Sequence, residues 1–290
     1  MSEEIRYFNS LDAANILGVN VSTIKRWTEE GKLECIKTAG GHRKFLMQHL
    51  ADFLKTHKKD TSKVNLFPVE DDADLEISHH ILKKNYNHLI RYIHDQALLG
   101  HRAQVQKALN GMYLGQYPLH LIYDKIITPI LWRIGDMWES GEHTIIEEHF
   151  ITQTVRDAIV RLQGIINLPS RKQGKAFCLI MSQELHDIAL KMVDQILELK
   201  GYLVLNSGQM SPSLNIEKVF EKYQPDQVYI SSTVVQDVNL VQAEFDKICY
   251  ISEKYNVDVF VGGRGFETIQ FQHPSVKHRF FSFEELYKNV

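Results

Sequence analysis

Cysteine is scarce in this sequence, and its scarcity argues against two kinds of site. The 290 residues contain only Cys35, Cys178 and Cys249, which are odd in number and far apart. A disulfide framework or a cysteine-based zinc site would need closely spaced pairs, so neither is expected. We interpret the three thiols as small apolar side chains of the interior.

Long apolar runs are also missing. No segment approaches the run of about 18 apolar residues that reads as a membrane-spanning helix. The opening residues, MSEEIRYFNS, carry acids where a secretory signal peptide would carry bases. Both absences predict a protein of the cytoplasm.

The net charge is small, at −3, but it is unevenly distributed. Residues 1–59 hold 10 Lys and Arg against 7 Asp and Glu, whereas residues 60–290 hold 23 against 29. The first segment is therefore +3 and the remainder −6. A basic excess at one end is a weak indication of contact with nucleic acid there.

The spacing of apolar residues predicts a multi-domain α and α/β protein. Its predicted segments are a first domain at 1–59, a solvated linker at 60–76, a bundle of four or five helices at 77–170 and an α/β domain at 171–290. In the last segment, β-rich apolar runs alternate with amphipathic stretches; the runs are 176–181, 202–207, 227–233, 257–263 and 279–283. Such alternation predicts a doubly wound parallel sheet of the Rossmann-like kind.

The first domain has the pattern of a winged helix-turn-helix. Ser10 and Ser22 are placed to cap two short helices, and Gly18 is placed to end the first of them. Two β-prone segments then flank Gly40 and Gly41, which would supply positive φ at the tip of a hairpin.

Six residues of this domain are candidates for DNA contact. The second helix carries three near its start, where a recognition helix meets the groove, and the hairpin carries three beside the phosphates. They are Thr23, Lys25, Arg26, His42, Arg43 and Lys44. Trp27 and Phe45 lie on apolar faces and are assigned to the core.

The segment LDAANILGVNVSTIKRWTEEGKLECIKTAGGHRKF resembles the DNA-binding domain of the MerR family. The resemblance covers about the first 55 residues and includes the wing. It implies a double-stranded DNA operator as partner, with Arg43 and Lys44 on phosphates and Thr23, Lys25 and Arg26 in the groove.

Polar or glycine-rich stretches follow three of the predicted strands. They are His186, Ser231-Ser232-Thr233 and Gly262-Gly263. Because ligands of parallel α/β sheets bind beyond the carboxyl ends of the strands, these stretches should converge on one binding edge. Adjacent glycines let a bulky ligand approach the backbone, hydroxyls donate hydrogen bonds, and an imidazole can ligate a metal.

The run Glu184-Leu185-His186-Asp187-Ile188-Ala189, followed by SST and GG, resembles the cobalamin-binding domain of methyltransferases and mutases. The resemblance implies that His186 is the lower axial cobalt ligand and that the later strand ends hold the displaced nucleotide tail. Glu184 or Asp187 would orient the imidazole, and the sequence leaves both open. Ala189 stands where this family commonly has glycine.

The helical segment IGDMWESGEHTIIEEHF resembles the light-sensing regulators of the CarH/LitR group, which share this domain order. The resemblance implies a repressor that binds adenosylcobalamin, with Trp138 over the adenosyl group and Glu148 and His149 in contact with it. It also implies a homo-oligomer, a dimer or tetramer, controlled by the cofactor. Glu139 replaces the histidine that follows the tryptophan in that group.

Other interpretations remain open. Trp138 could belong to the bundle core, and Glu148 and His149 point about 100° apart on a helix, so they do not form a metal pair. An enzyme is disfavoured because the sequence has no room for a substrate barrel and shows no other catalytic constellation. A regulator of this architecture that no longer uses cobalamin stays possible, given Ala189 and Glu139.

Overall fold

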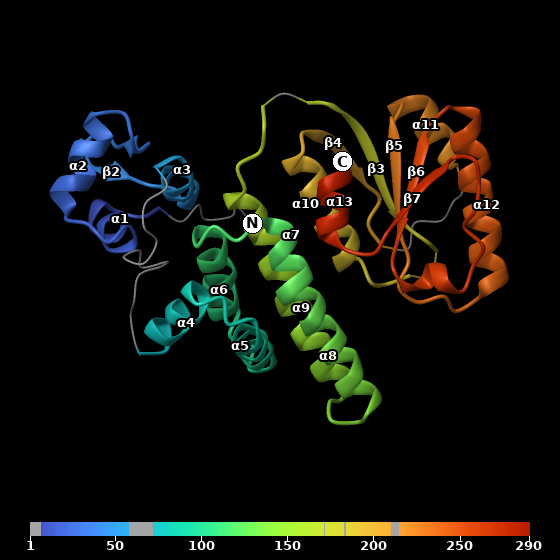
Figure 1. The fold of residues 1–290 in the computed structure, drawn as a ribbon, viewed down its shortest axis with the longest axis horizontal. Coiled ribbons are helices and arrows are strands. Elements are labelled where there is room, and N and C mark those ends of the chain that lie inside the picture. The colour runs from blue at the N-terminus through green and yellow to red at the C-terminus, as the bar shows by residue number, and fades with distance from the viewer. Residues whose placement is uncertain (1–6, 58–71, 171, 183, 210–214) are drawn as a thin grey trace. The chain divides into compact units, whose positions relative to one another are not determined.

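The computed structural model describes residues 7–57, 72–170, 172–182, 184–209 and 215–290. The chain forms two compact units, Met1–Asn167 and Leu168–Val290 (Figure 1). The first is helical apart from one small hairpin, and the second is an α/β unit. Within the described ranges, none of the helices combines the length and the apolar character that crossing a membrane requires.

The N-terminal part is a winged helix-turn-helix. Its elements are α1 (Ser10–Ile16), α2 (Val21–Glu29), β1 (Ile36–Lys37), β2 (Arg43–Lys44) and α3 (Met47–His57). The strands pair antiparallel, with Ile36 opposite Lys44. Trp27 and Phe45 are buried, as predicted, and Trp27 packs on Phe53 of α3.

Local signals at three turns were misread from the sequence. The cap of α1 is Asn9, not Ser10, because the Asn9 side chain accepts from the amides of Leu11 and Asp12 at 2.8 and 3.0 Å. The helix α2 begins at Val21, so Ser22 lies inside it rather than at its cap. Only Gly41 has positive φ in the hairpin, at 77°.

The helical part that follows is a bundle, as predicted. Its elements are α4 (Asp72–Leu82), α5 (Tyr86–Leu98), α6 (Arg102–Leu114), α7 (Leu119–Ile122), a π-helical turn η2 (Tyr123–Ile127), α8 (Thr128–Glu139), α9 (Ile145–Leu162) and a 3₁₀ turn η3 (Gln163–Ile165). The elements α7, η2 and α8 follow one another without a break, so the described residues form five helical rods. Gly100 and Gly141, two of the predicted breaks, adopt positive φ.

The helix α4 begins inside the predicted linker. Of the segment 60–76, residues up to 71 lie outside the described ranges, but residues 72–76 are helical. The acidic run that suggested a solvated linker suits the first turn of a helix, where the macrodipole favours negative charge. Asp74 is buried and accepts from Lys107 at 2.7 and 2.8 Å, which fastens α4 to α6.

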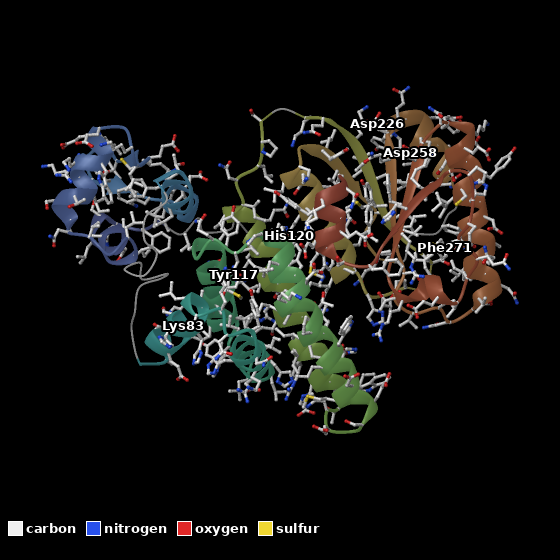
Figure 2. All side chains as sticks on the ribbon, in the orientation of Figure 1. Lys83, Tyr117, His120, Asp226, Asp258 and Phe271 are labelled. Atoms are coloured by element: carbon white, nitrogen blue, oxygen red, sulfur yellow. The ribbon has the colours of Figure 1, made fainter. Side chains whose placement is uncertain are left out.

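One buried hydroxyl joins the end of α4 to the turn between α6 and α7. The Tyr117 hydroxyl, labelled in Figure 2, donates to the Ile81 carbonyl at 2.6 Å. Burial raises the pKa of Tyr117, so the phenol keeps its proton and remains a donor.

The C-terminal unit confirms the doubly wound parallel sheet. Its elements are β3 (Gly174–Ile180), α10 (Ile188–Leu199), β4 (Tyr202–Asn206), α11 (Ile216–Tyr223), β5 (Gln227–Ser231), α12 (Val238–Lys254), β6 (Asp258–Gly262), a 3₁₀ turn η4 (Arg264–Glu267), β7 (Val276–Phe280) and α13 (Phe283–Asn289). The strand order is β4-β3-β5-β6-β7, and every pair is parallel. The helices α10 and α13 cover one face, and α11 and α12 cover the other (Figure 1).

Two expectations for this unit need correction. The fifth strand is Val276–Phe280 rather than 279–283, because the Ser282 side chain accepts from the Glu285 amide and caps α13. Cys178 and Cys249 are buried, as expected, but Cys35 is only partly buried.

Candidate functional site

Three strand ends lie side by side at one edge of the sheet. Ser231 at the end of β5 pairs in register with Ile180 of β3 on one side and with Gly262 of β6 on the other. The opposite edge is marked by Asp226 and Asp258, labelled in Figure 2, which lie at the amino ends of β5 and β6. The register therefore brings together the stretches that the sequence placed after β3, β5 and β6.

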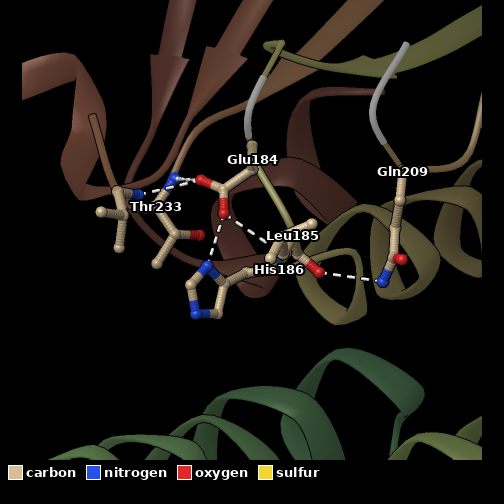
Figure 3. A network of polar contacts seen from close by, with 6 residues as sticks. Glu184, Leu185, His186, Gln209 and Thr233 are labelled. Carbon is tan, nitrogen blue, oxygen red and sulfur yellow. Dashed lines mark hydrogen bonds and ion pairs between the residues drawn. The ribbon is translucent and has the colours of Figure 1, made fainter. Parts of the chain in front are cut away.

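Glu184, which follows β3, is the centre of the polar network at this edge (Figure 3). One carboxylate oxygen accepts from the backbone amides of Thr233 and Val234 at 2.6 and 2.9 Å. The other accepts from the His186 amide at 2.9 Å and contacts His186 Nδ1 at 2.5 Å. One buried carboxylate thus holds the histidine and the loop after β5.

The charge of Glu184 is maintained by these contacts. Burial alone would raise the pKa of its carboxyl, but the hydrogen bonds from His186, Val234 and Thr233 outweigh burial and lower it. The ionised carboxylate accepts a hydrogen bond from Nδ1–H, which fixes the tautomer of His186. The other ring nitrogen, Nε2, then carries the lone pair on a side chain that is 56% exposed.

Of the two candidate acids, Glu184 is the one with a described contact to the imidazole. Glu184 makes the contact, whereas Asp187 is buried at the start of α10. Ala189 lies in the first turn of α10 and is partly buried.

The turns after β5 and β6 interlock through the backbone. The Ser232 amide donates to Gly262 at 3.0 Å, and the Gly265 amide donates to Ser232 at 3.0 Å. A Cβ added at Gly263 would lie 2.0 Å from the Ser232 carbonyl oxygen, and one at Gly265 would lie 2.2 Å from Ser232 Oγ. The missing side chain at Gly263 was predicted to make room for a ligand. It also makes room for the backbone of the neighbouring turn. Ser232 Oγ is fully buried and makes no hydrogen bond.

This interlock gives a stability prediction. We expect Gly263→Ala to lower the free energy of unfolding by about 3 kcal/mol, because its φ is +104° and the new methyl would clash with the Ser232 backbone. The matched control is Gly262→Ala, whose Cβ would lie 3.5 Å from the Phe280 carbonyl, an ordinary contact. Urea unfolding of both variants tests this. Equal midpoints for the two would mean that the turns relax freely.

The residues predicted to contact the adenosyl group, Trp138, Glu148 and His149, lie on α8 and α9 of the first unit. Trp138 is 48% exposed, so the alternative that it belongs to the bundle core is wrong. Glu148 accepts from the Thr152 hydroxyl at 2.8 Å, and its other oxygen lies 3.4 Å from His149 Nε2. Five large apolar side chains of α8 and α9 are also exposed; they are Trp132, Trp138, Ile145, Ile146 and Phe150. These helices therefore offer exposed apolar side chains and one carboxylate–imidazole pair.

On the recognition helix, Lys25 and Arg26 are exposed and Thr23 is partly exposed. Arg26 lies 4.0 Å from Glu30, an exposed ion pair that contributes little stability and leaves the guanidinium accessible. These residues therefore present positive charge on α2.

The wing residues have different surroundings. The Arg43 guanidinium donates to the Thr28 hydroxyl at 2.7 Å and to Glu29 at 3.1 Å, so it connects β2 to α2. Lys44 is exposed, with its ammonium 5.2 Å from the Tyr7 ring centre, and His42 is exposed at the hairpin tip. Lys44 and His42 are therefore more exposed than Arg43.

Several residues of the sheet edge escaped the sequence analysis. The Gln209 side chain donates to the Leu185 carbonyl at 2.9 Å and supports the histidine loop (Figure 3). Val234 takes part only through its backbone amide, which no side-chain pattern reveals. Gly265 could have been found, since it is the third glycine of the run GGRG.

Comparison with known proteins identifies two domains in this chain. A family described as a helix-turn-helix domain matches residues 7–58. A family described as a B12 binding domain matches residues 89–163, which fall on the helices α5 to α9 rather than on the sheet.

Whole-chain comparisons agree with this pairing. The chain is 25% identical over 232 residues to the HTH-type transcriptional repressor CarH of Myxococcus xanthus, covering 76% of this chain and 77% of that protein. The monomethylamine corrinoid protein of Methanosarcina barkeri shares the fold, with a TM-score of 0.58 and 15% identity over 70% of this chain and 96% of that one. These similarities and the two domain matches support a CarH-like, cobalamin-binding transcriptional regulator.

Proposed function

We propose that this chain is a cytoplasmic repressor that binds an operator through its winged helix-turn-helix and senses adenosylcobalamin and light through the remaining domains. The observation that carries the proposal is the Glu184–His186 pair at the carboxyl edge of a parallel sheet, in a chain that also has a DNA-binding domain. Cofactor-controlled homo-oligomerisation, to a dimer or tetramer, would couple the two activities.

The residues at the sheet edge fit a cobalamin. His186 offers Nε2 as a ligand, since Glu184 occupies Nδ1. A metal-bound imidazole commonly donates its other ring N–H to a carboxylate, as His186 does to Glu184 here. Ser232 Oγ, buried without a partner, offers a hydrogen bond to the nucleotide tail near Gly263.

When bound, adenosylcobalamin supplies a light-sensitive cobalt–carbon bond. The residues of this chain would hold the cofactor and contact its adenosyl group. His186 would hold the lower side of cobalt, and Glu184 would fix the ring. On the bundle, Trp138 would cover the adenosyl group, and Glu148 and His149 would contact it. Removal of that group leaves Trp138 without its ligand, so the two states differ in the contacts that favour DNA binding.

The DNA-binding half of the proposal rests on charge and exposure. Lys25 and Arg26 on α2 would enter the groove together with Thr23, and Lys44, His42 and Arg43 would lie along the phosphates. Because Arg43 also binds Glu29 and Thr28, it would fix the position of the wing relative to α2.

A corrinoid carrier for methyl transfer is the second candidate, since the solved corrinoid protein has the same fold. The helix-turn-helix domain at residues 7–58 favours a regulator, because a methyl carrier has no need of a DNA-binding module.

The third candidate function is that of a regulator that has lost the cofactor. Absorption of the purified protein separates it from the others, because a cobalamin protein is red to orange.

The light response gives a sharper test. We expect the dark complex with adenosylcobalamin to bind DNA and visible light to release it, leaving a product with only one imidazole on cobalt. Glu139, exposed at the end of α8, stands where the CarH/LitR group has a second histidine. A carboxylate is the poorer ligand here. His143 does not substitute, because it is buried with its Nε2 3.2 Å from His94 Nε2.

The measurements are DNA binding, gel filtration and electron paramagnetic spectra before and after illumination, for the wild type and Glu139→His. The variant should acquire the two-imidazole product. A wild-type product that already shows two imidazoles would contradict the role of Glu139. A light-insensitive DNA complex would mean that the protein senses cofactor abundance. One unchanged assembly with and without cofactor in the dark would contradict the coupling to oligomerisation.

A further inference from the structure

Two histidines and a glutamate converge where α4 meets α5. Glu76 and His80 are four residues apart on α4 and so share one face, and His88 lies in the first turn of α5. Glu76 Oε1 lies 3.8 Å from His80 Nε2 and 3.7 Å from His88 Nε2. One potential ligand atom from each residue lies within 4.8 Å of the other two.

The two imidazoles are held in place by the corner between the helices. Lys84 adopts positive φ there, at 52°, which reverses the chain and brings α5 back alongside α4. The rings of His80 and His88 stack with centroids 3.5 Å apart and planes 14° apart. Both side chains are about three-quarters buried, at 21% and 25% exposure, whereas Glu76 is 63% exposed.

Asn85 links the two histidines. Its Oδ1 accepts from the His88 amide at 3.3 Å, which caps α5, and its Nδ2 lies 3.1 Å from His80 Nδ1. One side chain therefore contacts the His80 ring and the His88 backbone.

We propose that Glu76, His80 and His88 bind a zinc ion, with water in the fourth position. Two imidazoles and one carboxylate form a donor set that zinc uses in proteins. Ligand atoms about 2.0–2.2 Å from a tetrahedral zinc lie about 3.3–3.6 Å apart, so the measured 3.7 and 3.8 Å need to shorten by only a few tenths of an ångström. Calcium and magnesium are disfavoured because both prefer oxygen ligands.

Binding requires two local changes. The nearly parallel rings must splay so that both Nε2 lone pairs point at one ion. Zinc on His80 Nε2 also leaves the proton on Nδ1, which needs an acceptor, whereas Asn85 now presents its NH₂ group there. The Asn85 amide must therefore turn over and present Oδ1 to His80. The bound ion would fasten α4 to α5 at the start of the bundle.

This requirement makes Asn85→Asp an informative variant. A carboxylate can accept from His80 Nδ1 and from the His88 amide at once, so we expect zinc affinity to rise by about 10-fold.

The experiment is calorimetric titration of Zn²⁺ into chelator-treated full-length protein. We expect one ion per chain at this site, a rise in thermal stability on binding, and a loss of affinity of at least about 10-fold in His80→Gln. The matched control is His79→Gln, which removes the adjacent exposed histidine of the same helix. The same Zn²⁺ titration of His186→Ala tests for binding at the sheet edge, and unchanged zinc affinity in this variant excludes it.

Equal affinity in His80→Gln and His79→Gln, or no change in Asn85→Asp, would overturn the proposal. Uptake of adenosylcobalamin by His80→Gln should match the wild type. That readout separates failure of the zinc site from failure of the proposed cofactor function.

Discussion

Replacement of His186 by alanine should reduce the affinity for adenosylcobalamin by at least about 100-fold. The variant removes the proposed ligand itself, whereas loss of a supporting residue around a metal site already costs about 10- to 100-fold. Glu184 would also lose the imidazole contact it now makes. The measurement is an absorption titration of the full-length protein in the dark, which reports both affinity and the axial ligand.

The control for this experiment is His278→Ala. His278 Nε2 lies 2.6 Å from Glu285, so the variant removes another histidine–carboxylate pair from the same unit. Its cofactor affinity should equal that of the wild type. If His186→Ala bound as tightly as the wild type and with the same spectrum, the ligand assignment would be wrong.

Operator binding should weaken by about a thousandfold between 50 and 200 mM salt. If each protomer of a bound dimer neutralises about three phosphates, about six counterions are released and the affinity falls steeply with salt. The wing residues His42, Arg43 and Lys44 are the ones proposed to lie along the phosphates. Electrophoretic or fluorescence titrations over this salt range give the slope.

Single substitutions should change that slope in a predictable way. Lys44→Ala removes one phosphate contact from each protomer, so the slope of log affinity against log salt should become shallower by about 2. Lys83→Ala removes an exposed charge after α4, outside the DNA-binding domain, and should leave it unchanged (Figure 2). A salt slope that is the same in Lys44→Ala would show that Lys44 does not face the phosphates.

The sequence predicted the fold wherever apolar periodicity extended over a whole element. The strands β3 and β5 are mostly buried apolar runs, and β6 alternates buried with partly buried apolar residues, so all three were found with their order along the chain. Errors fell at element ends, where a single side chain decides the boundary. Asn9 outcompeted Ser10 as a cap, and Ser282 ended β7 early by capping α13.

The candidate sites also contain residues that a sequence pattern predicts and contacts that only the fold shows. His186 and Glu184 were identified from a motif, but only the fold shows that the glutamate reaches Nδ1 while also holding the loop after β5. The spacing of Glu76 and His80 was visible in the sequence. Their partner, His88, lies beyond a corner whose positive φ at Lys84 has no clear sequence signal.

Glu184 has two structural roles, and only one of them depends on the cofactor. Its contacts with the Thr233 and Val234 amides support the loop after β5 whatever the ligand, whereas its contact with His186 matters to the cofactor. A descendant that abandoned cobalamin would be free to replace the histidine while the glutamate stayed to keep the loop in place. In relatives of this chain, a retained glutamate therefore reports an intact loop, and only the histidine reports the ligand.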